Sequence, residues 1–238
     1  MEWLEKRGYL LGTASLATLI LGGYLALVWS PPDVNQHDVM RIMYVHVPSA
    51  WTAYLAFFLT LVGSAMYLWK RDIKWDRLAV SATEIGVLMT ALTLATGSTW
   101  GRPIWGVWWT WDPRLTTTAI LFVIYVGYLM LRAMQPDPSA RAMQSAVIGI
   151  LGFLDIPIIH FSVLWWRSLH QGPTILQPGL KNPTMDGRME VALVVNVLAF
   201  TILFAYLLGQ RMRLAHMEEG RDALLYMQAQ HEEEQQRA

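Results

Sequence analysis

Long apolar stretches alternate with shorter polar ones along the whole of this 238-residue chain. Six apolar stretches lie at about 8–29, 47–69, 79–97, 115–134, 143–166 and 190–210. Each is close to the roughly 20 residues that an α-helix needs to cross the hydrocarbon core of a bilayer. The pattern predicts an all-α, polytopic membrane protein, folded as a bundle of six transmembrane helices.

The composition supports a membrane location. Hydrophobic residues make up 54% of the chain and charged residues only 15%, whereas charged residues make up roughly 25% of an average soluble domain. The first apolar stretch follows Lys6 and Arg7, as in a signal peptide, but it exceeds the about 7–15 residues of a signal-peptide core. We therefore expect it to be a retained membrane anchor.

Basic residues are distributed unevenly between alternate connections. The N-terminus, the connections near 70–78 and 132–142 and the tail after residue 210 hold twelve of the 18 basic residues. Because cytoplasmic loops are enriched in Lys and Arg, both termini are predicted to be cytoplasmic. The other connections, 30–46, 97–115 and 167–189, then share the opposite face.

The last part of the chain differs from the six apolar stretches. We divide the chain into a six-span domain, 1–210, and a polar cytoplasmic tail, 211–238. In the tail, Leu214, Met217, Leu224 and Met227 form an apolar stripe, which predicts a helical extension. A solvated end and a helix that docks a partner both fit this pattern.

Tryptophan is concentrated in one short segment. Residues 100–116 read Trp-Gly-Arg-Pro-Ile-Trp-Gly-Val-Trp-Trp-Thr-Trp-Asp-Pro-Arg-Leu-Thr and contain five of the twelve tryptophans: Trp100, Trp105, Trp108, Trp109 and Trp111. Such a cluster suits either an aromatic belt at the membrane interface or a platform for a large flat ligand. If the segment is helical, Trp105, Trp108 and Trp109 share one face. A belt is expected to spread over several helix ends, so the concentration favours the platform.

Two of the six histidines are predicted to lie at the same depth. His46 precedes the second apolar stretch and His170 follows the fifth, and these two stretches cross the membrane in opposite directions. Two neutral imidazoles approaching from opposite sides are what a six-coordinate haem iron requires. The alternative is a pair of interfacial histidines that never meet, and His160, inside the fifth stretch, is the reserve ligand. The other three histidines are expected on the surface: His37, His216 and His231.

Local signals mark two helix starts. Pro48 is predicted to occupy the first turn of the second helix, and Asp112 to cap the fourth helix, with Pro113 at its first position. Arginines on the outer connections are candidate partners for the propionates of a porphyrin. They are Arg41, Arg102, Arg114 and Arg167.

Other features narrow the chemistry. The chain has no cysteine, which excludes thiolate metal sites and disulfides. It has no phosphate-binding loop and no zinc-protease motif, so we expect no ATP hydrolysis. Glu84 and Asp155 lie within apolar stretches, where charges are costly. For Glu84 we expect snorkelling or a contact with the tail, and for Asp155 bonds to backbone groups freed by Pro157.

Three segments together resemble a known family. They are the tryptophan-rich motif at 100–116, His-Val-Pro at 46–48, and Pro-Ile-Ile-His-Phe-Ser-Val-Leu-Trp-Trp-Arg-Ser-Leu-His-Gln-Gly at 157–172. They closely resemble the haem-handling protein C family (CcmC) of bacterial cytochrome c maturation, over all six spans but not the tail. The resemblance implies that haem b is held at the periplasmic face, with His46 and His170 as axial ligands. The implied haem-binding set is Trp100, Trp105, Trp108, Trp109, Trp111, Arg102, Asp112 and Arg114.

The resemblance also implies a setting in the bacterial inner membrane. Haem would pass to the periplasmic chaperone CcmE, beside the small membrane protein CcmD and the ABC transporter CcmA and CcmB. This is a delivery role without catalysis of its own, although a part in attaching haem to the chaperone is compatible with it, and we expect no nucleic-acid partner. Two alternatives stay open: a bis-histidine b-type electron-transfer cytochrome, and a transporter that moves haem through its own bundle.

Overall fold

The computed structural model describes residues 2–170 and 185–237, and most of these residues are helical. The main elements are α1 (Glu2–Tyr24), α2 (Met43–Lys70), α3 (Ile73–Trp105), α4 (Pro113–Met134), α5 (Pro138–Phe153), α6 (Asp155–Trp165) and α7 (Gly187–Arg237). A π-helical turn, Leu25–Trp29, extends α1, and a 3-10 turn, Asp38–Ile42, leads into α2.

Six segments of the described chain are long and apolar enough to cross a membrane, which confirms the predicted number of spans. They are Gly8–Trp29, Asp38–Lys70, Ile73–Trp105, Pro113–Met134, Pro138–Trp165 and Gly187–Glu218. The protein is therefore an all-α, multi-pass membrane protein.

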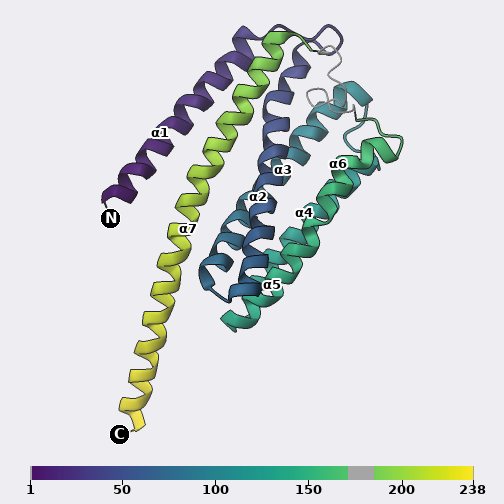
Figure 1. Ribbon diagram of the computed structural model, residues 1–238. Helices are drawn as coiled ribbons and strands as arrows, with labels where there is room; N and C mark the ends of the chain where they lie inside the picture. The colour runs from purple at the N-terminus through teal and green to yellow at the C-terminus, as the bar shows by residue number, and fades with distance from the viewer. Residues whose placement is uncertain (1, 171–184, 238) are drawn as a thin grey trace.

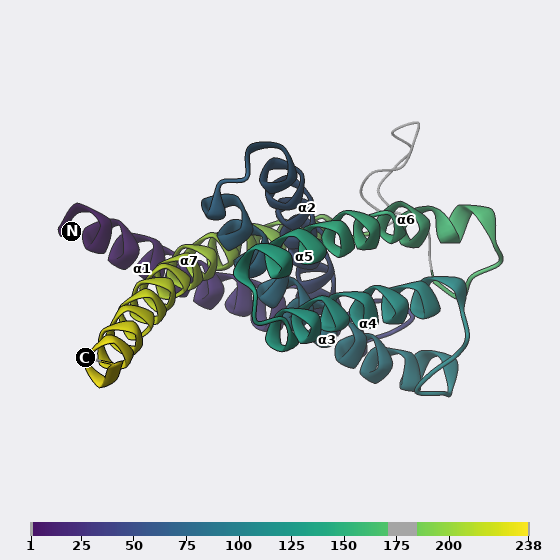
Figure 2. The ribbon, with the colours of Figure 1, turned by 90° about the horizontal axis from the view of Figure 1, so that it is seen from below.

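Helices α2 and α3 form a central antiparallel pair. Figure 1 shows α4, α5 and α6 on one side of this pair and α1 with α7 on the other, and Figure 2 shows the same grouping from below. The main core lies where these groups meet, and the rings of Phe57 and Tyr125 stack there with centroids 3.8 Å apart. A second cluster, which includes Tyr44 and Leu193, joins the start of α2 to α1 and α7.

The second helix begins earlier than the sequence predicts. It starts at Met43, so Pro48 is its sixth residue and does not lie in its first turn. The prediction was wrong because proline removes only one helical hydrogen bond, and the residues before it gain by packing into the core. Met43 and Tyr44 are each only 2% exposed.

The fifth span consists of two helices instead of one. Helix α5 ends at Phe153 and α6 begins at Asp155. Pro157 has no amide to bond the carbonyl four residues earlier, which accounts for the break. A buried carboxylate oxygen of Asp155, Oδ2, has no hydrogen-bond partner among the described residues, and the structure gives no support for the expected backbone bond at this atom.

Two ion pairs neutralise acids within the spans. Arg211 of α7 binds Glu84 through Nε to Oε2 and through Nη2 to Oε1, the latter at 2.9 Å. Of the two outcomes expected for Glu84, the structure thus shows the contact with the tail. Arg132 of α4 binds Asp76 of α3 through two hydrogen bonds of 2.6 and 2.8 Å. Helix α7 runs without a break through residue 210, so the tail begins as a continuation of the sixth span.

The longer connections gather at one end of the bundle. The described parts of the 30–46, 97–115 and 167–189 segments lie together there, and the turns after α2 and α4 lie at the other end (Figure 1). The candidate site is built from these longer connections and the helix ends beside them.

Candidate functional site

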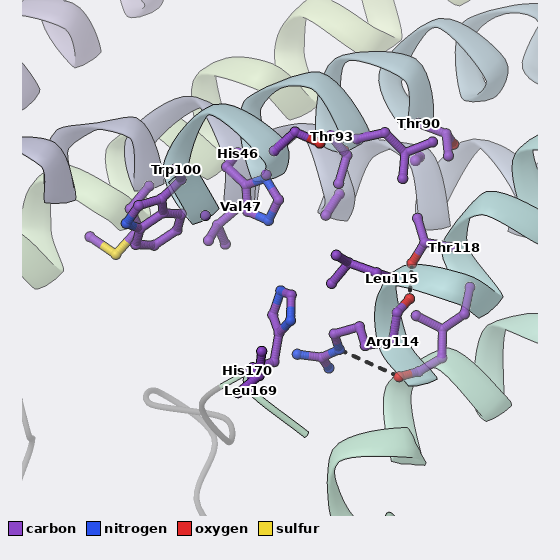
Figure 3. Close-up of a pocket in the computed structure, with 18 of the residues that line it drawn as sticks. His46, Val47, Thr90, Thr93, Trp100, Arg114, Leu115, Thr118, Leu169 and His170 are labelled. Carbon is purple, nitrogen blue, oxygen red and sulfur yellow. Dashed lines mark hydrogen bonds between the residues drawn. The ribbon is translucent and has the colours of Figure 1, made fainter. Parts of the chain in front are cut away.

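A cavity of about 530 Å³ opens at this end, between α2, α3, α4 and α6 (Figure 3). Its volume falls in the range of about 300–1,000 Å³ that is typical of small-molecule sites. The walls are mostly apolar, with residues such as Val47, Leu94 and Leu115. A few polar groups enter at defined positions, and three of them are histidines: His46, His160 and His170.

His46 lies in the first turn of α2 and lines the cavity. Its Nδ1 is 3.1 Å from the hydroxyl oxygen of Thr96 on α3. The next residue on α3 is Gly97, where an added Cβ would lie only 3.0 Å from His46 Cε1. The ring also makes an edge contact with Trp100, with centroids 5.7 Å apart. The ring is thus held against α3, and the absence of a side chain at Gly97 makes this approach possible.

His170 lies beyond the end of α6, and Asp112 positions its backbone. One oxygen of Asp112 accepts the Arg114 amide at 2.9 Å, which confirms the predicted cap of α4. The other accepts the Leu169 amide at 2.8 Å. The Nδ1 of His170 is 4.0 Å from Asp112 Oδ1 and has no hydrogen-bond partner among the described residues. A single carboxylate therefore joins the start of α4 to the segment that carries His170.

The electrostatics keep His170 neutral. Burial, together with the nearby Arg114 and His46, lowers the pKa of His170 to about 4, although Asp112 acts to raise it. Burial would by itself raise the pKa of Asp112, but hydrogen bonds from Leu169, Ser168 and Arg114 hold this pKa below its usual value. Near neutral pH the site therefore presents an uncharged imidazole beside a carboxylate.

The rings of His46 and His170 face each other from opposite walls of the cavity (Figure 3). The structure thus brings together the two histidines that the sequence placed at matched depth, while their role as iron ligands stays a prediction. His160 of α6 also lines the cavity, although the residue as a whole is exposed.

Only part of the tryptophan-rich motif reaches the cavity. Trp100, Trp105 and Trp109 line it, whereas Trp108 and Trp111 are 60% and 83% exposed and do not. The shared helical face considered for this segment does not form. Helix α3 ends at Trp105 because Gly106 takes a φ of +78°, a left-handed conformation that ends the helix.

The three lining tryptophans are held by specific contacts. Trp100 donates its indole N–H to the side-chain oxygen of Gln36 at 2.8 Å. Trp105 makes an edge contact with His170, with ring centroids 5.2 Å apart. Trp109 makes an edge contact with Trp111, with ring centroids 6.0 Å apart. His46 and His170 therefore each have one indole beside them.

Of the four candidate arginines, Arg114 alone lines the cavity. Its guanidinium makes two long contacts of 3.5 Å, to the carbonyls of Ile159 and His160. Arg102 is exposed and binds the Gly106 carbonyl. Arg41 pairs with Asp38 at 2.8 Å, and Arg167 is exposed. The structure thus does not bring Arg102 to the site predicted for it.

Sequence reasoning missed several residues that shape the cavity. Gln36, Thr96 and Gly97 support the tryptophan and histidine side chains, and Tyr54 lines the cavity wall. The Thr-Gly-Ser sequence at 96–98, near the end of an apolar stretch, was the available signal, because a glycine inside a helix often marks a close approach.

The fold and the cavity define a class: polytopic helical membrane proteins with a large apolar pocket at one end, two histidines facing across it, and indoles along its wall. The family model described as Heme exporter protein C matches residues 1–226. The chain belongs to this family, so it is a haem-handling transport component of cytochrome c biogenesis, as the resemblance implied.

Individual relatives agree with the family match. Heme exporter protein C of Bradyrhizobium diazoefficiens is 36% identical over 220 residues, which cover 92% of this chain and 82% of the relative. Heme exporter protein C of Escherichia coli (strain K12) is 35% identical over 205 residues, covering 85% and 81% of the two chains. A putative cytochrome c biosynthesis ccmC-like mitochondrial protein of Marchantia polymorpha is 34% identical over 186 residues, covering 78% and 76%.

Proposed function

We propose that this chain holds haem b between His46 and His170 at the periplasmic face of a bacterial inner membrane and delivers it to the chaperone CcmE. The observation that carries this proposal is the placement of the two histidine rings, which face each other across an apolar cavity of about 530 Å³. Porphyrin supplies four equatorial nitrogens, so two imidazoles complete a six-coordinate iron.

The residues around the cavity fit the rest of a haem molecule. The macrocycle is broad and apolar, and Trp100, Trp105 and Trp109 offer aromatic surface along the wall. Its two propionates are anionic, and Arg114 reaches the cavity with a guanidinium that makes two long contacts of 3.5 Å to the described residues. Charge-assisted hydrogen bonds from this guanidinium would orient the propionate edge.

The location of the site suits delivery better than electron transfer. His46 lies in the first turn of α2 and His170 beyond the end of α6, whereas a b-type electron-transfer subunit would place its ligands well inside the spans. The exposed Trp108 and Trp111 lie on the 106–112 segment next to the cavity. We propose that this segment presents haem to CcmE, with CcmD and the transporter subunits CcmA and CcmB in the same complex.

The visible spectrum of the purified full-length protein tests the ligand pair. We expect a six-coordinate, low-spin haem spectrum, which His46→Ala and His170→Ala each weaken or convert to a mixed-spin one. His216→Ala is the matched control, because His216 is exposed on α7. If His160→Ala abolished the low-spin spectrum and His170→Ala left it unchanged, the pair would be wrong and His160 would be a ligand.

Two tryptophan variants test delivery separately from retention. Trp108 does not line the cavity, so Trp108→Ala should reduce covalent haem on CcmE while low-spin haem in this protein is kept. Trp109 lines the cavity, so Trp109→Ala should lower haem retention as well. Both quantities are measured on the same preparations. Full transfer of haem from the Trp108→Ala variant would contradict a role in delivery and favour the alternative, in which Trp108 belongs to an aromatic belt at the membrane interface.

A further inference from the structure

The structure assigns Thr96 as the positioning residue that fixes the proton of His46 on Nδ1 and leaves Nε2 free to bind iron. The tautomer follows from contacts within this chain, and its use in binding haem rests on the proposed function. Thr96 lies on α3, and its hydroxyl oxygen lies 3.1 Å from His46 Nδ1 on α2.

The argument begins with the single proton of the Thr96 hydroxyl. Its Oγ1 lies 2.7 Å from the Leu92 carbonyl oxygen and 3.2 Å from the Thr93 carbonyl oxygen, both on its own helix. A carbonyl can only accept a hydrogen bond, so the hydroxyl proton is donated to the backbone. The oxygen then has only lone pairs to offer to any other group.

Those lone pairs face the His46 ring. The distance from Thr96 Oγ1 to His46 Nδ1 is 3.1 Å, within hydrogen-bonding range. If Nδ1 were unprotonated, two acceptors would face each other at this distance, or the 2.7 Å bond to Leu92 would have to break. The contact is a hydrogen bond only when Nδ1 carries the proton.

The remaining neighbours keep the ring in this orientation. Gly97 allows Cε1 to lie close to the α3 backbone, and Trp100 packs edge-on against the ring. In a neutral imidazole with its proton on Nδ1, the Nε2 nitrogen carries the free lone pair. The His46 ring projects into the cavity toward His170 (Figure 3), so an iron ligand is preset on this wall.

On the opposite wall, no hydrogen bond from the described residues fixes the tautomer of His170. The Nδ1 of His170 has no hydrogen-bond partner among the described residues, and the nearest Asp112 oxygen is 4.0 Å away. A hydrogen bond from this Nδ1 to Asp112 needs an approach of about 1 Å. The two histidines therefore differ: contacts within the protein fix the tautomer of His46 before haem binds, but not that of His170.

The tautomer can be read directly in the protein without haem. We would label the histidine rings with ¹⁵N in the full-length chain, reconstitute it in lipid nanodiscs, and assign His46 as the signal that is missing in His46→Ala. Protonated and unprotonated ring nitrogens resonate far apart. We expect Nδ1 of His46 to be of the protonated type and Nε2 of the unprotonated type.

Three variants test the role of Thr96. Thr96→Val should move His46 toward a mixture of tautomers, and Thr96→Ser should restore the wild-type signals because it keeps the hydroxyl. Thr99→Val is the matched control: the Thr99 hydroxyl makes the same kind of bond, 2.8 Å to the Ala95 carbonyl, but Thr99 is exposed and has no hydrogen bond to a histidine among the described residues. This control should leave the His46 signals unchanged.

A haem titration of the same variants then measures the consequence. Loss of a group that orients a metal-binding histidine typically lowers affinity about 10- to 100-fold, and we expect Thr96→Val near the lower end of that range, with Thr96→Ser near wild type. A proton on Nε2 in the wild-type protein, or unchanged His46 signals in Thr96→Val, would overturn the assignment. Absence of haem binding by the wild type would instead refute the proposed function, and the two failures are therefore distinguishable.

Discussion

Replacing Asp112 with alanine should release His170 from the site. The Asp112 carboxylate caps α4 through the Arg114 amide at 2.9 Å and holds the Leu169 amide at 2.8 Å. Because Leu169 is one residue from His170, loss of this bond should lower haem retention.

The magnitude follows from the two bonds. Loss of a helix cap costs about 0.5–2 kcal/mol, and a hydrogen bond to a charged group contributes about 1.5–3 kcal/mol. The second value corresponds to a change of roughly 10- to 150-fold in the population of the docked segment. Because apparent affinity scales with the fraction of protein in the competent state, haem affinity should fall by up to that factor.

The chain contains a matched control at the other end of the bundle. Asp137 caps α5, with Pro138 at the first helical position, and its carboxylate accepts the Ser139 amide at 2.9 Å. Asp137→Ala therefore removes a cap of the same Asp-Pro type without touching a histidine. The assay is haem titration of both variants, combined with hydrogen exchange at residues 166–170. Equal haem affinity in the two variants, with unchanged exchange at 166–170, would refute the reasoning.

Three further predictions concern the same end of the molecule. Val107→Cys, at an exposed position of the 106–112 segment, should react with an impermeant thiol reagent from the periplasmic side, and labelling only after the inner face is opened would reverse the proposed orientation. Gly97→Ala should displace the His46 ring by a few tenths of an ångström and weaken the low-spin spectrum, because the new Cβ would lie 3.0 Å from His46 Cε1. Gly127→Ala is the control, because the space around Gly127 is open. Equal spectra from the two variants would contradict a role for Gly97 in placing His46. In the folded protein the pKa of His170 is lowered to about 4, so the ring stays neutral down to that pH. In the unfolded chain the ring takes up a proton at its ordinary pKa of about 6.5. The stability gained from burying the neutral ring is therefore complete above about pH 6.5 and is lost as the pH falls toward 4. Haem affinity should therefore change little from pH 7 to 5 and fall near pH 4. A steady tenfold loss of haem affinity per pH unit below pH 6.5 would show that burial does not lower the pKa of His170.

The sequence by itself determined the number of spans, the cap at Asp112 and the common end of the bundle for His46 and His170. These features depend on local quantities: the length and hydropathy of each stretch, the Asp-Pro pair at a helix start, and the alternation of direction from one span to the next. None of them requires knowledge of which helices touch. A contact between Glu84 and the tail was one of the two outcomes expected from the sequence, because a charge within a span is costly.

Tertiary structure decided which side chains reach the cavity. The motif at 100–116 reads as one unit, yet the left-handed Gly106 divides it, so that only three of its tryptophans line the wall. The hydrogen bond between Asp112 and Leu169 joins residues 57 positions apart, and the contact between His46 and Thr96 joins residues 50 positions apart. Such contacts depend on how α2, α3, α4 and α6 pack, and packing is set by the combined shape of many side chains, which no local pattern contains.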